Sequence, residues 1–221
     1  MTILAIDTSC SVASAALLRD GQVLRELKSG TQLDHSRMIL PLCERLLGES
    51  GEKLSGVDVF CAVTGPGSYT GIRIGVSSVK GFCFALSKPC FGASSLLSAA
   101  YSGDLPEGVI WALVHARQDE FYVASFEKNG EAITRLSEDR AMLAEEIKPL
   151  VGENHALCGS GAGLFFETTQ KGRLFKDSFG AAGAAKNSCQ AALSDQLINC
   201  RELMPSYLKP PQAERLRGMS L

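Results

Sequence analysis

The sequence predicts a duplicated α/β fold with two similar halves, and three observations support this. Short apolar runs of strand length alternate with segments whose apolar residues recur at helical spacing. The order of these elements in the first half returns in the second half. Each half also has a hairpin turn at the matching place, Asp20-Gly21 in the first and Asn129-Gly130 in the second.

The first half reads as three strands, a helix, a strand and a second helix. The three strands form a meander, and the helix after them begins at Asp34, a residue type that favours the N-cap. Pro41 lies inside this helix, where it removes one backbone donor and should bend the axis. We expect these six elements at residues 3–6, 12–18, 22–27, 34–47, 57–63 and 71–86.

The second half repeats this order. We expect strands at residues 109–115, 121–126 and 131–136, a helix at 142–151, a strand at 155–158, more helix after the loop 159–163, and a loop at 180–185 leading into a helix through Leu197. A link rich in chain breakers at residues 102–108 divides the chain into 1–103 and 104–221. Such a duplication is typical of the actin-like (ASKHA) architecture, in which two α/β subdomains with a ribonuclease H-like motif face each other across a cleft.

Composition narrows the function. With a formal net charge of −2, nothing indicates that the whole chain binds nucleic acid as a polyelectrolyte, so any role with RNA should be local or indirect. The eight cysteines stand singly with no Cys-x-x-Cys spacing, which favours reduced core residues of a cytoplasmic protein. The apolar N-terminus meets Asp7 at once, so it predicts a strand rather than a signal peptide or membrane segment.

A turn after the first strand holds candidate phosphate-binding residues, namely Asp7, Thr8, Ser9 and Ser11. In actin-like ATPases an aspartate here holds hydrated Mg²⁺, and neighbouring N–H groups meet the phosphates. The glycines that such a loop uses are absent, so an alternative is that these side chains only satisfy the backbone of a tight turn. The mirror position, residues 115–120, has no acidic residue directly at the strand end, which weakens the case for phosphoryl transfer.

Other catalytic patterns are weak or missing. The loop Gly159-Ser160-Gly161-Ala162-Gly163 has the place of an adenosine-binding loop, but alternating glycines are more often only a loop. His35, His115 and His155 form no His-x-x-x-His pair, and no Gly-x-Ser-x-Gly elbow occurs. The sequence therefore predicts no catalytic residue and no metal ligand.

The glycine-rich segment 65–86 is the most informative. Gly65-Pro66-Gly67 predicts a tight turn, and the helix after it has Gly71, Gly75 and Ser78 on one side. Glycine inside a helix costs about 1 kcal/mol relative to alanine, so close approach of another helix is the expected compensation. That helix could be the one at residues 34–47 or one from another protein, and the residues alone leave both open.

Three motifs then point to one family: Ile3-Leu4-Ala5-Ile6-Asp7-Thr8-Ser9, His35-Ser36-x-x-x-Leu40-Pro41 and Gly65-Pro66-Gly67-Ser68-Tyr69-Thr70-Gly71-Ile72-Arg73-Ile74-Gly75. Residues 116–122 and Pro205-Ser206-Tyr207-Leu208-Lys209 agree with it too. Over nearly its whole length the chain resembles the TsaB (YeaZ) family of bacterial tRNA threonylcarbamoyladenosine biosynthesis proteins. One departure is His115, where the family commonly has Asp.

The resemblance implies an actin-like fold with a degenerate second subdomain. It further implies a non-catalytic role in making N6-threonylcarbamoyladenosine at position 37 of tRNAs that read codons beginning with A. The chain would dimerise with and activate a TsaD-type transferase, which carries the metal and the His-x-x-x-His pair. The resemblance also implies that a TsaE-type ATPase binds to the complex. The chain would contact tRNA only indirectly, through the complex, and ATP or ADP would bind to the complex rather than to this chain alone.

In the family, the first two helices of each partner form the dimer interface, and the same face could make a homodimer. The expected interface residues are His35, Ile39, Leu42, Leu46, Tyr69, Gly71, Arg73, Gly75, Ser78 and Phe82. A bulky residue at Gly75 should then block the partner and leave the monomer folded. The alternative is an actin-like ATPase, kinase or peptidase acting on its own, for which Asp7 is the residue to test.

Overall fold

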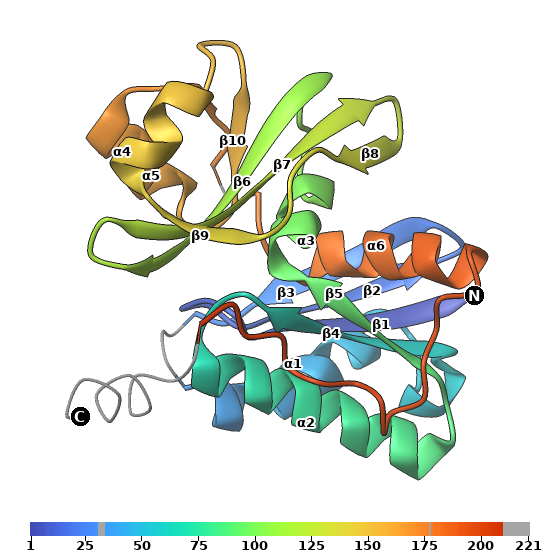
Figure 1. Cartoon of the computed structure of the whole chain (residues 1–221). Helices are drawn as coiled ribbons and strands as arrows, with labels where there is room; N and C mark the ends of the chain where they lie inside the picture. The colour runs from blue at the N-terminus through green and yellow to red at the C-terminus, as the bar shows by residue number, and fades with distance from the viewer. Residues whose placement is uncertain (31–33, 177, 210–221) are drawn as a thin grey trace, which may run out of the picture.

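Two β-sheets lie one above the other, with helices between them and on both outer faces (Figure 1). The computed structural model describes residues 1–30, 34–176 and 178–209. We call the first sheet with its helices the first lobe and the second sheet with its helices the second lobe. Among the described residues, no helix has the length and apolar character needed to cross a membrane.

The first sheet has the strand order β3-β2-β1-β4-β5. The bounds are β1 Thr2–Asp7, β2 Ser14–Arg19, β3 Gln22–Lys28, β4 Val59–Gly65 and β5 Cys90–Ser94. The first three strands are the antiparallel meander that the sequence predicts, and β4 and β5 continue in parallel. All six residues of β1 are buried, because helices cover both faces of the sheet.

Alternate residues of β1 enter two different cores. Leu4 and Ile6 pack with α1 (His35–Glu49) and α2 (Tyr69–Leu86), while Ile3 and Ala5 pack with α6 (Ala181–Leu193). A short 3-10 turn, η1 (Leu54–Gly56), precedes β4. The helix expected at 34–47 is therefore confirmed as α1 with Pro41 inside it, although the Asp34 side chain makes no capping hydrogen bond.

The second sheet has the order β11-β10-β6-β7-β8, with β9 also paired to β7. The bounds are β6 Gly108–Arg117, β7 Glu120–Asn129, β8 Ala132–Arg135, β9 Arg140–Leu143, β10 Ala156–Cys158 and β11 Arg173–Leu174. Helix α3 (Ser95–Tyr101) packs on one face, and α4 (Ala144–Ile147) and α5 (Ala162–Thr169) pack on the other. The fold thus has five layers, with α3 and α6 between the sheets (Figure 1).

Two sequence predictions in the second half are wrong. Residues 142–151 do not form one helix, because Met142 pairs with Phe121 in β9 and only α4 and the 3-10 turn η2 (Lys148–Leu150) follow. Residues 180–185 are not a loop, since α6 begins at Ala181. Their small side chains serve close packing instead, because a Cβ on Gly183 would lie 1.9 Å from the backbone oxygen of Ser98 in α3.

Helix α6 returns the chain to the first lobe. Its first N–H groups are held from that lobe, where Ser14 Oγ accepts from Ala181 N at 2.9 Å and Glu26 Oε1 accepts from Ala182 N at 2.9 Å. The division at residues 103 and 104 remains a prediction about domains, but residues 181–193 pack on the first sheet. All eight cysteines are free and six of them are buried, as the sequence predicts for core residues.

Candidate functional site

The turn after β1 uses its polar side chains on its own backbone. Asp7 is buried, and its Oδ1 accepts hydrogen bonds from Ser9 N at 2.8 Å and from Ser9 Oγ at 2.6 Å. Burial raises the pKa of the Asp7 carboxyl above its ordinary value, and the two hydrogen bonds from Ser9 act in the opposite direction. This geometry agrees with the turn-stabilising alternative that the sequence left open.

The same turn meets the glycine-rich start of α2. Ser68 caps the helix, its Oγ accepting from Gly71 N at 3.2 Å, and Ser68 N donates to Ser9 O at 2.7 Å. Thr8 Oγ1 donates to Gly71 O at 2.7 Å. The two motifs that stood apart in the sequence therefore form one interlocked unit.

Gly71 and Gly75 provide the space for this contact. A Cβ on Gly71 would lie 2.0 Å from Thr8 O, and a Cβ on Gly75 would lie 2.6 Å from Thr8 Oγ1. Within this chain they face the β1 turn rather than another helix, which corrects the interpretation of these glycines as a helix-packing surface. A leucine at Gly75 would push against Thr8 and Ile6, so we expect Gly75→Leu to destabilise the monomer as well as any interface.

The other expected interface residues divide by burial. Those inside the core of the first lobe are His35, Ile39, Leu42 and Leu46. Ile39, Leu42 and Leu46 pack in this core, and His35 Nε2 lies within hydrogen-bond distance of Cys10 O, at 2.8 Å. The candidates that keep solvent exposure are Tyr69, Arg73, Ser78 and Phe82, so of the ten only these four have surface for a partner in this conformation.

Helix α2 presents a continuous solvent-exposed stripe. Its residues lie three or four positions apart and all are exposed; they are Thr70, Arg73, Ser77, Gly81 and Phe84. Phe84 is 80% exposed, and a Cβ on Gly81 would meet nothing within 4 Å. On the neighbouring α1, Leu40 is 50% exposed. We call the five α2 residues the outer stripe.

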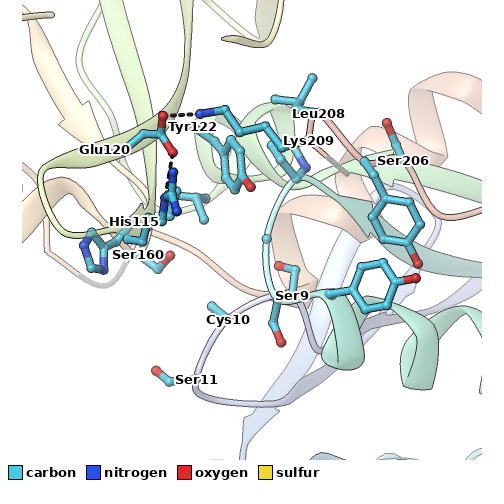
Figure 2. Close-up of a pocket in the computed structure, with 18 of the residues that line it drawn as sticks. Ser9, Cys10, Ser11, His115, Glu120, Tyr122, Ser160, Ser206, Leu208 and Lys209 are labelled. Atoms are coloured by element: carbon cyan, nitrogen blue, oxygen red, sulfur yellow. Dashed lines mark hydrogen bonds and ion pairs between the residues drawn. The ribbon is translucent and has the colours of Figure 1, made fainter. Parts of the chain in front are cut away.

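A cleft of about 770 Å³ opens between the lobes. Ser9 and Ser11 line it from the first lobe, whereas Asp7 and Thr8, the other two phosphate-loop candidates, do not. The second lobe contributes residues of the mirror segment, including His115, whose Nε2 lies 2.8 Å from Gln118 O. Figure 2 shows these side chains facing the cleft from opposite sides. Among the residues that the structure describes, no three metal-ligating side chains gather at one point.

Residues 206–209 complete the lining of the cleft, a role that the sequence did not predict for them. Tyr207 stacks on Tyr69 with ring centroids 4.6 Å apart, and Arg73 Nε donates to Tyr207 Oη at 2.8 Å. Lys209 forms an ion pair with Glu120 of β7 (Figure 2). In the sequence, residues 205–209 served only as a family motif. The aromatic Tyr207 and the cationic Lys209 were the features that could have pointed to a contact with the cleft.

Comparisons with known proteins agree with this fold. The family model TsaD, tRNA N6-adenosine threonylcarbamoyltransferase, matches residues 29–216. The chain is 28% identical to the tRNA threonylcarbamoyladenosine biosynthesis protein TsaB of Bacillus subtilis, over 97% of this chain and 96% of that one. It is 30% identical to TsaB of Haemophilus influenzae, over 95% and 94%.

Solved structures give the same picture. YeaZ from Pseudomonas aeruginosa matches with a TM-score of 0.83 and 26% identity over 94% of this chain and 99% of that one. The activator of 2-hydroxyisocaproyl-CoA dehydratase from Clostridium difficile, solved with bound ADPNP, matches with a TM-score of 0.56 at 12% identity, a likeness of fold alone. The predicted actin-like fold is confirmed.

Proposed function

The chain belongs to the TsaB (YeaZ) family of tRNA threonylcarbamoyladenosine biosynthesis proteins, and from this we propose that it is a non-catalytic subunit that dimerises with and activates a TsaD-type transferase. The modified base would be adenosine 37 of tRNAs that read codons beginning with A. A TsaE-type ATPase would join the complex, ATP or ADP would act at the level of the complex, and tRNA would be met through it in the cytoplasm.

The outer stripe of α2 is the observation that carries this proposal. Gly81 and Ser77 let another backbone approach closely, and the exposed Phe84 supplies an apolar anchor at one end of the helix. A TsaD family model matches most of this chain, so the transferase is expected to have corresponding helices. Two related chains can then pack the same face against each other around an approximate twofold axis. The same geometry allows a homodimer when the transferase is absent.

The chemistry of the β1 turn supports a subunit more than an independent enzyme. The Asp7 carboxylate is turned to Ser9 and lies outside the residues that line the cleft. A kinase or ATPase would need that oxygen at its metal and phosphates. ATP hydrolysis by the purified chain, abolished by Asp7→Ala without unfolding, would contradict the proposal.

Gly81→Leu tests the interface. The added side chain would stand in open space on the free monomer, so folding should be unaffected, while a close helix contact should be lost. Gly163→Leu is the matched control, because Gly163 lies in α5 of the second lobe and a Cβ there also meets nothing within 4 Å. We expect Gly81→Leu to weaken binding of the TsaD-type partner at least tenfold by calorimetry, and Gly163→Leu to leave it unchanged.

A second measurement tests the role itself. Depletion of the chain in cells should remove N6-threonylcarbamoyladenosine from digested tRNA, as measured by mass spectrometry of nucleosides. The wild-type chain and Gly163→Leu should restore the nucleoside, and Gly81→Leu should not. Full restoration by Gly81→Leu, or equal partner affinity of the two variants, would refute the placement of the interface on the outer stripe.

A further inference from the structure

The segment that follows α6 crosses the surface of the first lobe and ends at the cleft. Ile198 pairs with Cys90 of β5 through two backbone hydrogen bonds of 2.8 and 2.9 Å. Leu203 is buried in the core under α2, and Ser206 N donates to Thr64 O at 2.8 Å. In Figure 1 this segment runs alongside α2, and its last described residues, 206–209, line the cleft. Residues 198–206 are therefore anchored to the first lobe.

The end of the described segment reaches across to the second lobe. Tyr207 remains on the first lobe through its stack on Tyr69 and its bond with Arg73. Two residues later, Lys209 forms its ion pair with Glu120, whose side chain is only 14% exposed. Arg117 Nε lies 3.6 Å from the other carboxylate oxygen of Glu120. Two cations therefore approach this carboxylate, and Figure 2 shows the contact between Lys209 and Glu120.

The covalent connections between the lobes lie elsewhere. The chain passes from the first sheet to the second by way of α3 and residues 102–107, and it returns from β11 to α6, with Ser178 and Gly180 preceding that helix. These two passages are neighbours, because a Cβ on Gly103 would lie 3.1 Å from Ser178 Oγ. None of the described residues in either passage lines the cleft, whereas residues 206–209 do. Two adjacent chain crossings form a natural hinge, and a contact at the open side of the cleft controls rotation about it.

We propose that residues 203–209 form a clasp that holds the two lobes together across the mouth of the cleft, with the ion pair between Lys209 and Glu120 as its closing contact. The stack of Tyr207 on Tyr69 fixes the clasp on α2, so the ammonium group of Lys209 is held beside the Glu120 carboxylate. Opening the clasp lets the lobes rotate apart and exposes the cleft loops at residues 9–11 and 115–118. A hydrogen bond from Ser94 Oγ to Asp139 Oδ2 at 3.2 Å also joins the lobes, near α3.

Charge exchange tests the clasp. Lys209→Glu places like charges at the closing contact. Glu120→Lys does the same and also sets a cation against Arg117 inside the second lobe, a cost that the double variant keeps, while the double variant restores opposite charges between positions 120 and 209. Amide hydrogen exchange of the cleft loops, followed by mass spectrometry, should become about fivefold faster in each single variant and return toward wild type in the double variant. In wild type, raising the salt concentration should speed exchange of the same loops.

Lys171→Glu is the matched control. Lys171 pairs with Glu153 inside the second lobe, so the same charge change occurs without spanning the cleft. Unchanged exchange in both single variants, or a double variant no slower than the singles, would overturn the clasp. The clasp shares Arg73 with the outer stripe, through its bond to Tyr207, but neither Lys209 nor Glu120 belongs to the stripe. Loss of partner binding by Gly81→Leu and opening by Lys209→Glu are therefore separate results.

Discussion

Gly71→Ala and Gly81→Ala make the same change in one helix and should have opposite effects on stability. At Gly71 the new Cβ would lie 2.0 Å from Thr8 O. A normal contact between carbon and oxygen is about 3.3 Å, so the β1 turn must move by about 1.3 Å. That movement strains the hydrogen bond from Thr8 Oγ1 to Gly71 O, which is buried.

The two costs can be estimated separately. Overpacking of a close contact costs about 1 to 3 kcal/mol, and loss of a buried hydrogen bond costs about 1 to 3 kcal/mol more. We therefore expect Gly71→Ala to lower the free energy of unfolding by about 2 to 6 kcal/mol. At Gly81 a Cβ meets nothing within 4 Å, so alanine should raise stability by about 1 kcal/mol through helix propensity.

Urea unfolding followed by circular dichroism measures both variants. The transition midpoints should move in opposite directions while the slope of free energy against urea stays the same. The melting temperature of Gly71→Ala should fall by about 10 °C. If Gly71→Ala were within 1 kcal/mol of wild type, Thr8 would not be pressed against α2, and the account of the interlocked turn and helix would be wrong.

Three further predictions use the same kinds of measurement. Asp7→Asn should be more stable than wild type at pH 7, and urea titrations should show this difference in stability shrinking toward pH 4. The reason is that burial raises the pKa of the Asp7 carboxyl, so the wild-type protein loses stability as the pH rises above the pKa of the unfolded state. A difference that stayed constant with pH would contradict this. Iodoacetamide at pH 8 should label Cys200 before Cys10. Both residues are partly exposed, but burial raises the pKa of the Cys10 thiol to about 12. Mass spectrometry of peptides gives the order of labelling, and the reverse order would contradict the prediction. His155→Ala should lower the free energy of unfolding by about 1 to 3 kcal/mol, because His155 Nδ1 accepts hydrogen bonds from Trp111 Nε1 at 3.1 Å and from a backbone N–H at 3.0 Å. Fluorescence of the single tryptophan reports the unfolding, and an unchanged transition midpoint would refute this prediction.

Much of the first lobe could be predicted from the sequence because its signals are local. The hairpin at Asp20-Gly21 and the apolar periodicity of α1 and α2 depend on neighbours in the chain. Strand β5 and helix α3 were missed, since residues 90–101 form two short elements in one apolar run. In β9, pairing with β7 over a long sequence separation outweighs the helical pattern.

The candidate site was harder to predict, for a geometric reason. Periodicity identifies the side of α2 that carries Gly71 and Gly75, but it cannot tell what packs there. The partner turned out to be Thr8, more than 60 residues earlier in the chain. The contact of Lys209 with Glu120 depends equally on how the segment after α6 is folded back. Such contacts need the tertiary structure.

The return of α6 to the first lobe also has a consequence during synthesis. A nascent chain that has been translated as far as the link at residues 102–108 already contains every strand of the first sheet. One face of that sheet, including Ile3, Ala5 and Val63, stays uncovered until Ala181–Leu193 leaves the ribosome. An early termination product would therefore expose an apolar surface and is expected to aggregate or bind chaperones, so the first lobe can be completed only after the second has been made.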